Sequence, residues 1–263
     1  MTVAKNSACL KNLSAMKLLD IVEYLALHND KPMRLQDIAH GLSMNNSTVS
    51  RFLTSLTDYG YIQQDPETLR YRLTMKICMI ASHVSSSFSL TEMAHPYMRT
   101  IVEASDESAC LAIQQNNRVV YIAVQNGSDK ILQTMQRIGS NAPMYCTGIG
   151  KLLLTNYSGE EIFDLMSQEP MRRFTPNTIT TPEALIQEIE TVRSQGYALD
   201  DEECEQGARC VAVPIRDYTK NVVAGLSVTG TIFRLTPEKV DALLPLLKEQ
   251  ALLLSRNLGY IES

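Results

Sequence analysis

Small polar side chains and one arginine are concentrated on one side of a predicted helix around residue 50. Its apolar residues, spaced at i, i+3, i+4 and i+7, are Val49, Phe52, Leu53 and Leu56. The opposite side carries hydroxyl, amide and guanidinium groups, which can exchange hydrogen bonds with phosphates and with the edges of DNA bases. The candidate DNA-binding residues on this helix are Asn46, Ser47, Thr48, Ser50, Arg51 and Thr54.

A second short helix is predicted just before this one, across a tight polar turn. Its apolar residues, which also keep helical spacing, are Leu35, Ile38, Ala39 and Leu42. Residues 43–46 have the length of a helix-turn-helix corner, and Asn45 or Asn46 can cap the following helix through its side chain. An ordinary helical hairpin inside a core has the same pattern, so both interpretations stay open at this level.

The flanking segments complete a winged helix-turn-helix. Residues 10–27 keep an apolar helical period and predict the first helix of a three-helix core. After Gly60, two short alternating runs separated by a turn at residues 65–68 predict a β-hairpin. In its second run Leu69, Tyr71 and Leu73 are expected to point inward, and Arg70 and Arg72 outward. Arg70 and Arg72 are candidate phosphate contacts, as is Arg34, although exposed arginines are often plain surface residues.

The charge is distributed unevenly along the chain. The net charge of the 263 residues is −5, which excludes a uniformly basic nucleic-acid coat. Residues 1–76 nevertheless hold nine Lys and Arg against seven Asp and Glu, and the remainder holds 15 against 22. The end with the predicted helix-turn-helix is therefore the basic end, as phosphate binding requires.

Cysteine and histidine usage limits the other functions. The six cysteines form no C-x-x-C pair, and no apolar signal segment begins the chain, so we expect a reduced, cytoplasmic compartment. No apolar run is long enough to cross a membrane. All four histidines lie at or before residue 95, which removes the commonest zinc and nucleophile–base arrangements from the rest of the chain.

The pattern changes to α/β beyond a predicted linker helix. Residues 74–92 form an apolar helix that runs into serines, which indicates a domain boundary. The predicted strands are 108–115 and 118–125, joined by a turn at 116–117, a strand or strand pair at 130–139, then 210–217 and 221–230. Predicted helices cover 93–105 and 146–157, and two more begin at Thr181 and Thr236, each before a proline. The last of them is expected to kink at Pro245.

Several residues of this second domain could bind a small acid. The glycines of residues 144–150 open the start of a helix, where backbone N–H groups attract anions, although they could equally serve helix-on-sheet packing. Ser227 and Thr229 alternate along one strand, so both hydroxyls face the same side. Lys151 is expected to point outward, and most of the acidic run at 200–205 is expected to face solvent.

Four segments in this order resemble the IclR-type bacterial transcriptional regulators over essentially the full length of the chain. They are MYCTGIGKLLL, RFTPNTIT, VRSQGYALDDEECEQGARCVAVPIRD and VAGLSVTG. The resemblance implies a GAF-like effector-binding domain, dimers or dimers of dimers, and palindromic operators. It also implies that Asp200 and Cys210 face the effector pocket, where Cys210 is a lining residue and not a nucleophile. Cys146, Ile149 and Thr229 depart from the residues common in the family, so the identity of the effector does not transfer.

We therefore predict an α+β protein with a winged helix-turn-helix DNA-binding domain at 1–74, a linker helix at 75–92 and an effector-binding and oligomerisation domain at 93–263. It is expected to be a non-enzymatic regulator of a catabolic operon, a repressor, without cofactor or metal. A sugar acid or keto acid is expected to change the spacing of its winged domains through the linker helix. The predicted effector-binding residues are Met144, Thr147, Gly148, Ile149, Asp200, Cys210, Ser227 and Thr229.

Two alternatives use the thiols instead. One is an enzyme with Cys210 or Cys146 as the reactive group on the GAF-like domain, for which no histidine base is available after residue 95. The other is a redox sensor using Cys204 and Cys210, which lie six residues apart across the acidic run.

Overall fold

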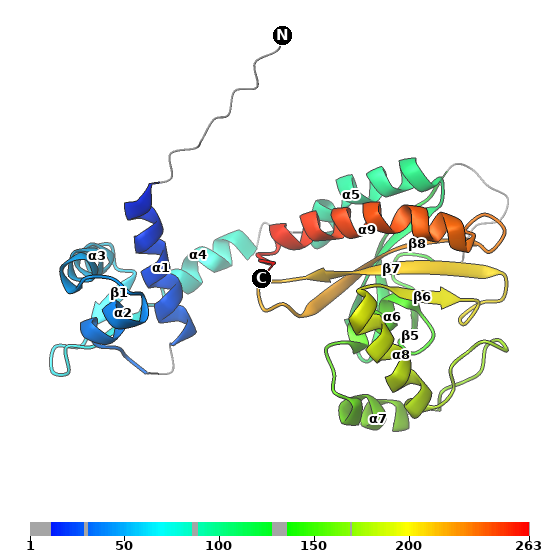
Figure 1. Ribbon diagram of the computed structural model, residues 1–263, viewed down its shortest axis with the longest axis horizontal. Helices are drawn as coiled ribbons and strands as arrows, with labels where there is room; N and C mark the ends of the chain where they lie inside the picture. Colours follow the sequence, from blue (N-terminus) through cyan, green and yellow to red (C-terminus); the bar gives the residue numbers. More distant parts are fainter. Residues whose placement is uncertain (1–11, 29–30, 86–88, 128–135, 169, 263) are drawn as a thin grey trace, which may run out of the picture. The chain divides into compact units, whose positions relative to one another are not determined.

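The computed structural model describes residues 12–28, 31–85, 89–127, 136–168 and 170–262. The chain divides into two compact units, residues 1–88 and 89–263 (Figure 1). Among the described residues no helix combines the length and the apolar character needed to cross a membrane.

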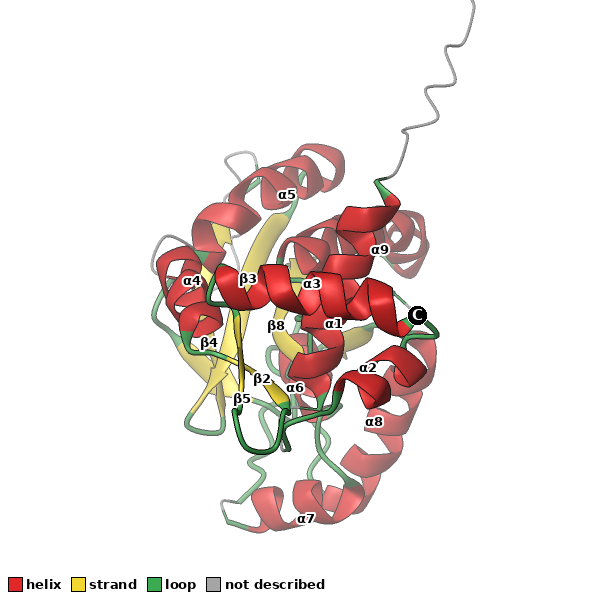
Figure 2. Ribbon diagram, turned by 90° about the vertical axis from the view of Figure 1, so that its left-hand side faces the viewer, coloured by secondary structure: helices red, strands yellow, loops and turns green. Residues whose placement is uncertain are grey.

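The first unit is a three-helix core with a small hairpin. Its elements are α1 (Leu13–Leu27), α2 (Leu35–Gly41), α3 (Asn46–Asp58), β1 (Ile62–Gln64), β2 (Tyr71–Leu73) and α4 (Lys76–Ser85). Figure 2 shows α2 and α3 meeting at the tight corner between them. The apolar faces of α1, α2 and α3 close one core, in which Ile21, Ile38 and Leu53 are fully buried. The predicted winged helix-turn-helix is therefore confirmed.

Three local details of this unit differ from the sequence prediction. Helix α1 begins at Leu13, where the Asn12 side chain accepts from the backbone N–H groups of the first turn, and residues 10 and 11 lie outside the described ranges. Asn45 occupies the N-cap position of α3, but its side chain makes no capping hydrogen bond. Leu69 has a φ of 54° and is 61% exposed, because it belongs to the hairpin turn and not to the alternating strand.

The second unit is a six-stranded antiparallel sheet covered by helices on both faces. The strand order is β5-β4-β3-β8-β7-β6. The strands are β3 (Ser108–Gln115), β4 (Arg118–Gln125), β5 (Asn141–Pro143), β6 (Ala198–Asp201), β7 (Ala208–Arg216) and β8 (Val222–Thr231). The helices are α5 (Leu90–Ser105), α6 (Gly148–Leu154), α7 (Gly159–Ser167), α8 (Pro182–Gln195) and α9 (Pro237–Asn257). Together with the first unit, this arrangement confirms the predicted α+β fold class.

Strand alternation assigns the side chains to two separate cores. Leu111, Val211 and Leu226 belong to the core under α5 and α9, whereas Cys110 and Ala212 belong to the core under α6 and α8 (Figure 1). In the ladder, Ser227 lies opposite Cys110, Thr229 lies opposite Cys210, and Cys210 lies opposite Asp200. Cross-strand partners share a face, so the predicted effector residues of three strands are brought to the α6 side of the sheet.

The remaining sequence predictions for this unit have mixed outcomes. The predicted strand or strand pair at 130–139 lies largely outside the described residues, and residues 138–139 form a turn. Strand β5 and helix α7 were not expected from the sequence. Helix α9 continues through Pro245 as one element. The segment predicted as a linker, 75–92, contains α4 and the first residues of α5.

Candidate DNA-binding helix and effector cavity

Helix α3 presents its polar side chains to solvent. Val49, Phe52, Leu53 and Leu56 are buried in the core of the first unit. Of the predicted DNA-binding residues on the same helix, five are exposed, namely Asn46, Ser47, Ser50, Arg51 and Thr54, and Thr48 is half-buried. The hydroxyl of Thr54 donates to the carbonyl oxygen of Ser50 over 3.0 Å, which leaves its oxygen free to accept. The structure thus places all six predicted helix residues on one surface.

Arg51 is the cation at the centre of this surface. Its guanidinium carbon lies 5.6 Å from the centre of the Phe52 ring, a contact that steadies the base of the side chain. Within the described residues no ion pair joins Arg51 to a carboxylate. The guanidinium therefore retains N–H donors for an external acceptor.

The three arginines predicted beside α3 have unequal environments. Arg70 donates from Nη1 to the carbonyl oxygen of Pro32 over 3.0 Å, which ties the hairpin to the segment before α2. Arg72 is exposed and lies across the ladder from Gln63, whose amide oxygen accepts from Nε and Nη2 of Arg72 in the orientation that satisfies both groups. Arg34 is exposed just before α2, and its backbone N–H donates to Oδ2 of Asp37 over 3.4 Å. Arg34 therefore has the freest guanidinium group of the three, and Arg72 retains Nη1.

An effector cavity of about 370 Å³ opens in the second unit between the sheet and the start of α6. It brings together four of the predicted effector residues: Thr147, Asp200, Cys210 and Thr229. Its other lining residues are Tyr121, Gln136, Ser140, Asn141, Ala142, Cys204, Glu205, Ala208 and Arg209. A space of this size accommodates a small organic molecule.

The other four predicted effector residues do not line this cavity. Met144 lines a neighbouring cleft. Gly148 packs on the sheet, where an added Cβ would lie 3.2 Å from Cβ of Ala212. Ile149 packs so closely over Gly225 that a Cβ there would lie 2.6 Å from its side chain. Ser227 is fully buried on β8, one alternation step from Thr229.

In the described part of the chain, two buried hydroxyls of β8 lack a nitrogen or oxygen partner, and one of them, that of Thr229, lines the effector cavity. Oγ of Ser227 and Oγ1 of Thr229 meet no hydrogen-bonding nitrogen or oxygen among the described residues. Both lie near the thiol of Cys210. Because a buried hydroxyl without a strong partner costs free energy, the Thr229 hydroxyl is available to a ligand that enters the cavity, whereas that of Ser227 lies behind the lining.

Asp200 supplies a carboxylate to the same cavity. Its Oδ1 accepts from the backbone N–H groups of Glu203 and Cys204, over 2.8 and 3.2 Å. Burial raises the pKa of Asp200 to about 6, even though these two hydrogen bonds favour the charged form. The side chain is therefore mostly ionised at neutral pH and gains a proton in mildly acidic solution.

The thiols around the cavity are held in their protonated form. Burial, with a smaller contribution from the charge of Asp200, raises the pKa of Cys210 to about 12. The pKa of Cys146 and that of Cys110 are also raised, for Cys146 mainly by a hydrogen bond with Cys204 and by burial. Since the thiolate is the nucleophile, these environments oppose thiol catalysis. In the described ranges, no group of three or more His, Cys, Asp and Glu side chains is arranged to hold a metal ion.

Lys151 does not point outward, contrary to the sequence prediction. Its side chain is 1% exposed, and Nζ donates to Oε1 of Glu203 over 2.5 Å, to Oε1 of Glu188 over 3.0 Å and to the carbonyl oxygen of Leu199 over 2.9 Å. Burial disfavours its charge, but the two carboxylates outweigh this effect and raise the pKa of Lys151. Helix α6 lies between the sheet and α8, so a side chain leaving its first turn meets protein and not water.

The acidic run is also less exposed than expected. Glu203 is buried, and burial raises its pKa to about 7. Thr178 donates to the carbonyl oxygen of Glu203 over 2.7 Å, and Thr175 donates to that of Glu202 over 2.6 Å. Only part of the run therefore faces solvent, and the loop that carries it is fixed against the wall of the cavity.

Arg209 and the β4–β5 residues are cavity residues that the sequence did not identify. Nε of Arg209 donates to Oδ1 of Asp201 over 2.8 Å, so the guanidinium is partly neutralised at the cavity mouth. Tyr121, Ser140 and Asn141 reach the cavity because β5 pairs with β4. Strand alternation could have placed Tyr121, but β5 is only three residues long and carries no strand pattern.

Comparison with known proteins covers both units. The family model described as "Bacterial transcriptional regulator IclR C-terminal" matches residues 82–256, and that described as "IclR helix-turn-helix domain" matches residues 14–66. The HTH-type transcriptional regulator KdgR of Escherichia coli is 32% identical over 94% of this chain and 93% of its own. The transcriptional repressor IclR of the same organism is 29% identical over 84% of this chain and 81% of its own.

A solved structure agrees with these matches. The crystal structure of the Thermotoga maritima IclR is 30% identical, covers 94% of this chain and 99% of its own, and superposes with a TM-score of 0.62. The similar proteins and both family models describe DNA-binding regulators and not enzymes. The chain therefore belongs to the IclR family of bacterial transcriptional regulators, with a helix-turn-helix DNA-binding domain and an effector domain.

Proposed function

We propose that the protein represses a catabolic operon and responds to a small organic acid that carries hydroxyl or keto groups. The observation that carries the proposal for the effector is the buried hydroxyl of Thr229, which lacks a nitrogen or oxygen partner among the described residues and lines the effector cavity together with Asp200. Support for repression comes from the similar E. coli protein, which is described as a transcriptional repressor. Such a regulator acts in the cytoplasm, where its DNA is found.

The effector cavity combines the donors and acceptors that such an acid requires. The hydroxyl of Thr229 and the amide of Asn141 can donate to a carboxylate or keto oxygen, whereas the hydroxyl of Thr147 already donates to the carbonyl oxygen of Pro143. Asp200 can accept from a ligand hydroxyl. Sugar acids and keto acids present these groups, and the cavity has room for only a few carbon atoms beyond them. Met144, Gly148 and Ile149 do not line the cavity. We propose that they set its shape indirectly, because they pack behind the residues that line it.

On the DNA side, α3 is proposed to enter the major groove. Arg51 suits a guanine or a phosphate, and the neutral polar residues of the helix suit neighbouring base edges. Arg34 and Arg72 are proposed to bind flanking phosphates, and Arg70 to do so while it supports the hairpin. In a two-fold symmetric assembly the two half-sites of a palindromic operator lie about 34 Å apart, or a multiple of this spacing.

Exposed apolar side chains support a dimer or a dimer of dimers. On α1, Leu13, Met16 and Leu19 are 67%, 43% and 56% exposed. Beside and on α4, Met75 and Met79 are 77% and 52% exposed. Side chains of this kind on two helices of a small domain are typical of a surface that another copy of the chain covers.

A gel-shift experiment with the full-length protein tests the proposal. The DNA is the intergenic region next to the protein's own gene, and the probes are D-gluconate and pyruvate. We expect a specific complex that one of the acids weakens by about 5- to 150-fold, the usual range for coupling between two sites. Arg51→Ala should weaken the complex about tenfold or more and still bind the acid, whereas Arg99→Ala, on the exposed surface of α5, should behave like the wild type.

Two outcomes would contradict the proposal. A complex that forms equally well with Arg51→Ala would show that α3 is not the recognition helix. A complex that forms only in the presence of the acid would show that the protein activates or co-represses and is not relieved by its effector.

A further inference from the structure

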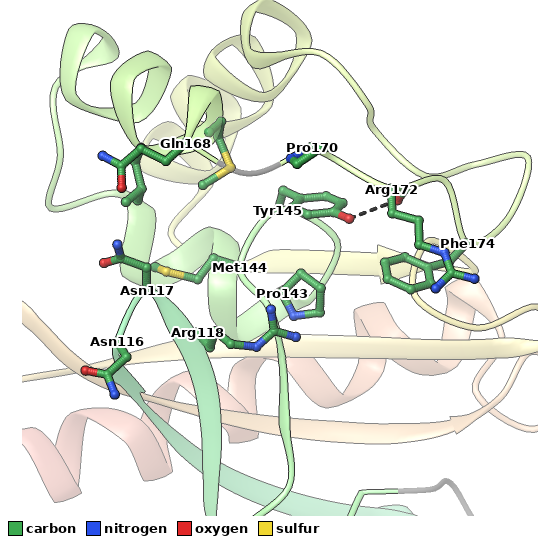
Figure 3. A pocket seen from close by; sticks show the side chains of 12 residues that line it. Asn116, Asn117, Arg118, Pro143, Met144, Tyr145, Gln168, Pro170, Arg172 and Phe174 are labelled. Carbon is green, nitrogen blue, oxygen red and sulfur yellow. Dashed lines mark hydrogen bonds between the residues drawn. The ribbon is translucent and has the colours of Figure 1, made fainter.

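A second cleft lies beside the effector cavity and has no role in the proposed function. Its volume is about 440 Å³, within the usual range of small-molecule sites. It lies between the β3–β4 turn, the segment after β5 and the α7–α8 loop (Figure 3). The lining residues used below are Arg118, Met144, Tyr145, Met166, Arg172 and Phe174.

The lining of this cleft is cationic. Among the residues that the structure describes, it includes the two arginines Arg118 and Arg172 and no aspartate or glutamate. Nε of Arg118 donates to Oδ1 of Asn141 over 2.6 Å, which fixes the side chain and leaves the terminal N–H groups for another acceptor. Arg172 is exposed, and its guanidinium carbon lies 5.6 Å from the centre of the Phe174 ring. The effector cavity, in contrast, contains the carboxylates of Asp200 and Glu205.

Two aromatic rings lie next to these cations. The rings of Tyr145 and Phe174 are 6.4 Å apart between centroids and inclined by 22°, so they are stacked. The hydroxyl of Tyr145 donates to the carbonyl oxygen of Arg172 over 2.9 Å, shown as a dashed line in Figure 3, and this bond holds the loop against the ring. Phe174 is 42% exposed. Tyr145 is 7% exposed, so Phe174 is the ring of the pair that is open to solvent and can accept a further flat ring.

Thioether side chains complete an apolar patch. Met144 is 1% exposed, and Met166 is half-buried at the end of α7. Methionine sulfur makes favourable contacts with aromatic rings and adapts to ligands of different shape. The cleft thus offers a flat apolar surface with guanidinium groups beside it.

We propose that this cleft is a second ligand site, for a small aromatic carboxylate. A guanidinium binds a carboxylate through two parallel hydrogen bonds, and its planar face also stacks on rings. The exposed ring of Phe174, backed by Tyr145, receives the ring of the ligand, and Arg172 or Arg118 receives its carboxylate. Among the described lining residues no carboxylate opposes the anion.

One hydrogen bond links a residue that lines the cleft to a residue that lines the effector cavity. Arg118 lines the cleft, and its partner Asn141 lines the cavity. The segment that follows Asn141 also separates the two spaces, since Met144 lines the cleft and Thr147 lines the cavity. The two ligands therefore bind on opposite sides of one wall.

Ligand-observed NMR on the full-length protein tests this site with three matched probes. Benzoate has both the ring and the charge, benzamide lacks the charge, and cyclohexanecarboxylate lacks the aromatic ring. We expect benzoate to bind, and benzamide and cyclohexanecarboxylate to bind at least about tenfold more weakly, the factor that corresponds to a loss of 1.4 kcal/mol. Equal binding of all three probes would overturn the proposal.

Matched variants locate the site. Arg172→Gln should weaken benzoate binding about tenfold, which corresponds to losing one charge-assisted hydrogen bond. Arg173→Gln is the control, because Arg173 directs its guanidinium to the carbonyl oxygen of Pro176 and to Thr180, away from the cleft. Thr229→Val, on the floor of the effector cavity, should leave benzoate binding unchanged. Benzoate binding that survives Arg172→Gln and Arg118→Gln, or that is lost with Thr229→Val, would refute the second site without affecting the proposed effector site.

Discussion

The ammonium nitrogen of Lys151 lies 2.5 Å from Oε1 of Glu203, and both side chains are buried between α6 and the loop that follows β6. A buried ion pair adds little compared with apolar residues of equal size, but removal of one partner leaves the other charge uncompensated. The pair therefore fixes the position of the loop next to Asp200, and the following prediction depends on it.

Lys151→Met should lower the free energy of unfolding by about 3 to 5 kcal/mol, because the charge of Glu203 loses its partner. Urea unfolding followed by circular dichroism measures the change. Arg99→Met serves as the control, since the ion pair of Arg99 with Glu103 is exposed and should contribute less than about 1 kcal/mol. Adding Glu203→Gln to Lys151→Met should recover part of the loss, and no recovery would mean that the pair is not the cause.

The Thr229 hydroxyl offers a test in which stability and ligand binding change in opposite directions. Because this hydroxyl is buried without a nitrogen or oxygen partner, Thr229→Val should stabilise the protein by about 1 kcal/mol. The same change should weaken effector binding about tenfold, if one hydrogen bond to the acid is lost. Thermal unfolding and calorimetric titration measure the two effects.

Thr175→Val is the matched control for this prediction. Thr175 is equally buried, but its hydroxyl donates to the carbonyl oxygen of Glu202 over 2.6 Å. Its replacement should destabilise the protein by about 1 to 3 kcal/mol, because a buried carbonyl group loses its donor. If both valine variants destabilise the protein to the same extent, the Thr229 hydroxyl has a partner after all.

The raised pKa of Asp200 should make a contribution to the free energy of unfolding that increases in mild acid. Its pKa is raised from 3.8 to about 6 by burial, so between these values the folded protein binds a proton that the unfolded chain does not. The stabilisation is complete below the unfolded pKa and is lost as the pH rises through about 6. For this group alone, lowering the pH from 7 to 5 should add about 1 kcal/mol to the free energy of unfolding.

Asp200→Asn isolates this contribution, because asparagine retains an oxygen that accepts from the same backbone N–H groups. The quantity to compare is the difference in unfolding free energy between pH 5 and pH 7, in the wild type and in the variant. The wild type should gain about 1 kcal/mol more than the variant on acidification. An identical pH dependence would show that Asp200 titrates normally.

The arginines of the first unit should differ in how they affect operator binding. Arg51→Ala should cost about 1 to 3 kcal/mol and relax the preference at one base pair of each half-site. Arg72→Ala should weaken all sequences alike and reduce the slope of log affinity against log salt by about one for each subunit. Fluorescence anisotropy over a series of salt concentrations, with operator and scrambled duplexes, separates the two cases. A sequence-dependent loss with Arg72→Ala would contradict the assignment of this residue to the phosphates.

Much of this protein is determined by local sequence. The helix-turn-helix follows from the spacing of the apolar residues around Leu53, because helical geometry brings residues three and four apart to one face. Ser227 and Thr229 share a face because β-strand side chains alternate, and the structure buries both. Thr181 and Thr236 cap their helices as their position before a proline predicts.

Only the tertiary structure decided the features that join distant segments. Lys151 is buried because Glu188 and Glu203, 37 and 52 residues further along the chain, close around it. The second cleft exists because the β3–β4 turn, the Tyr145 segment and the α7–α8 loop meet in space. Periodicity depends on the backbone within a few residues, whereas such contacts depend on how whole elements pack. The sequence therefore predicted the helix-turn-helix and four residues that the structure brings together around one cavity, and the packing decided the buried ion pair and the cationic cleft.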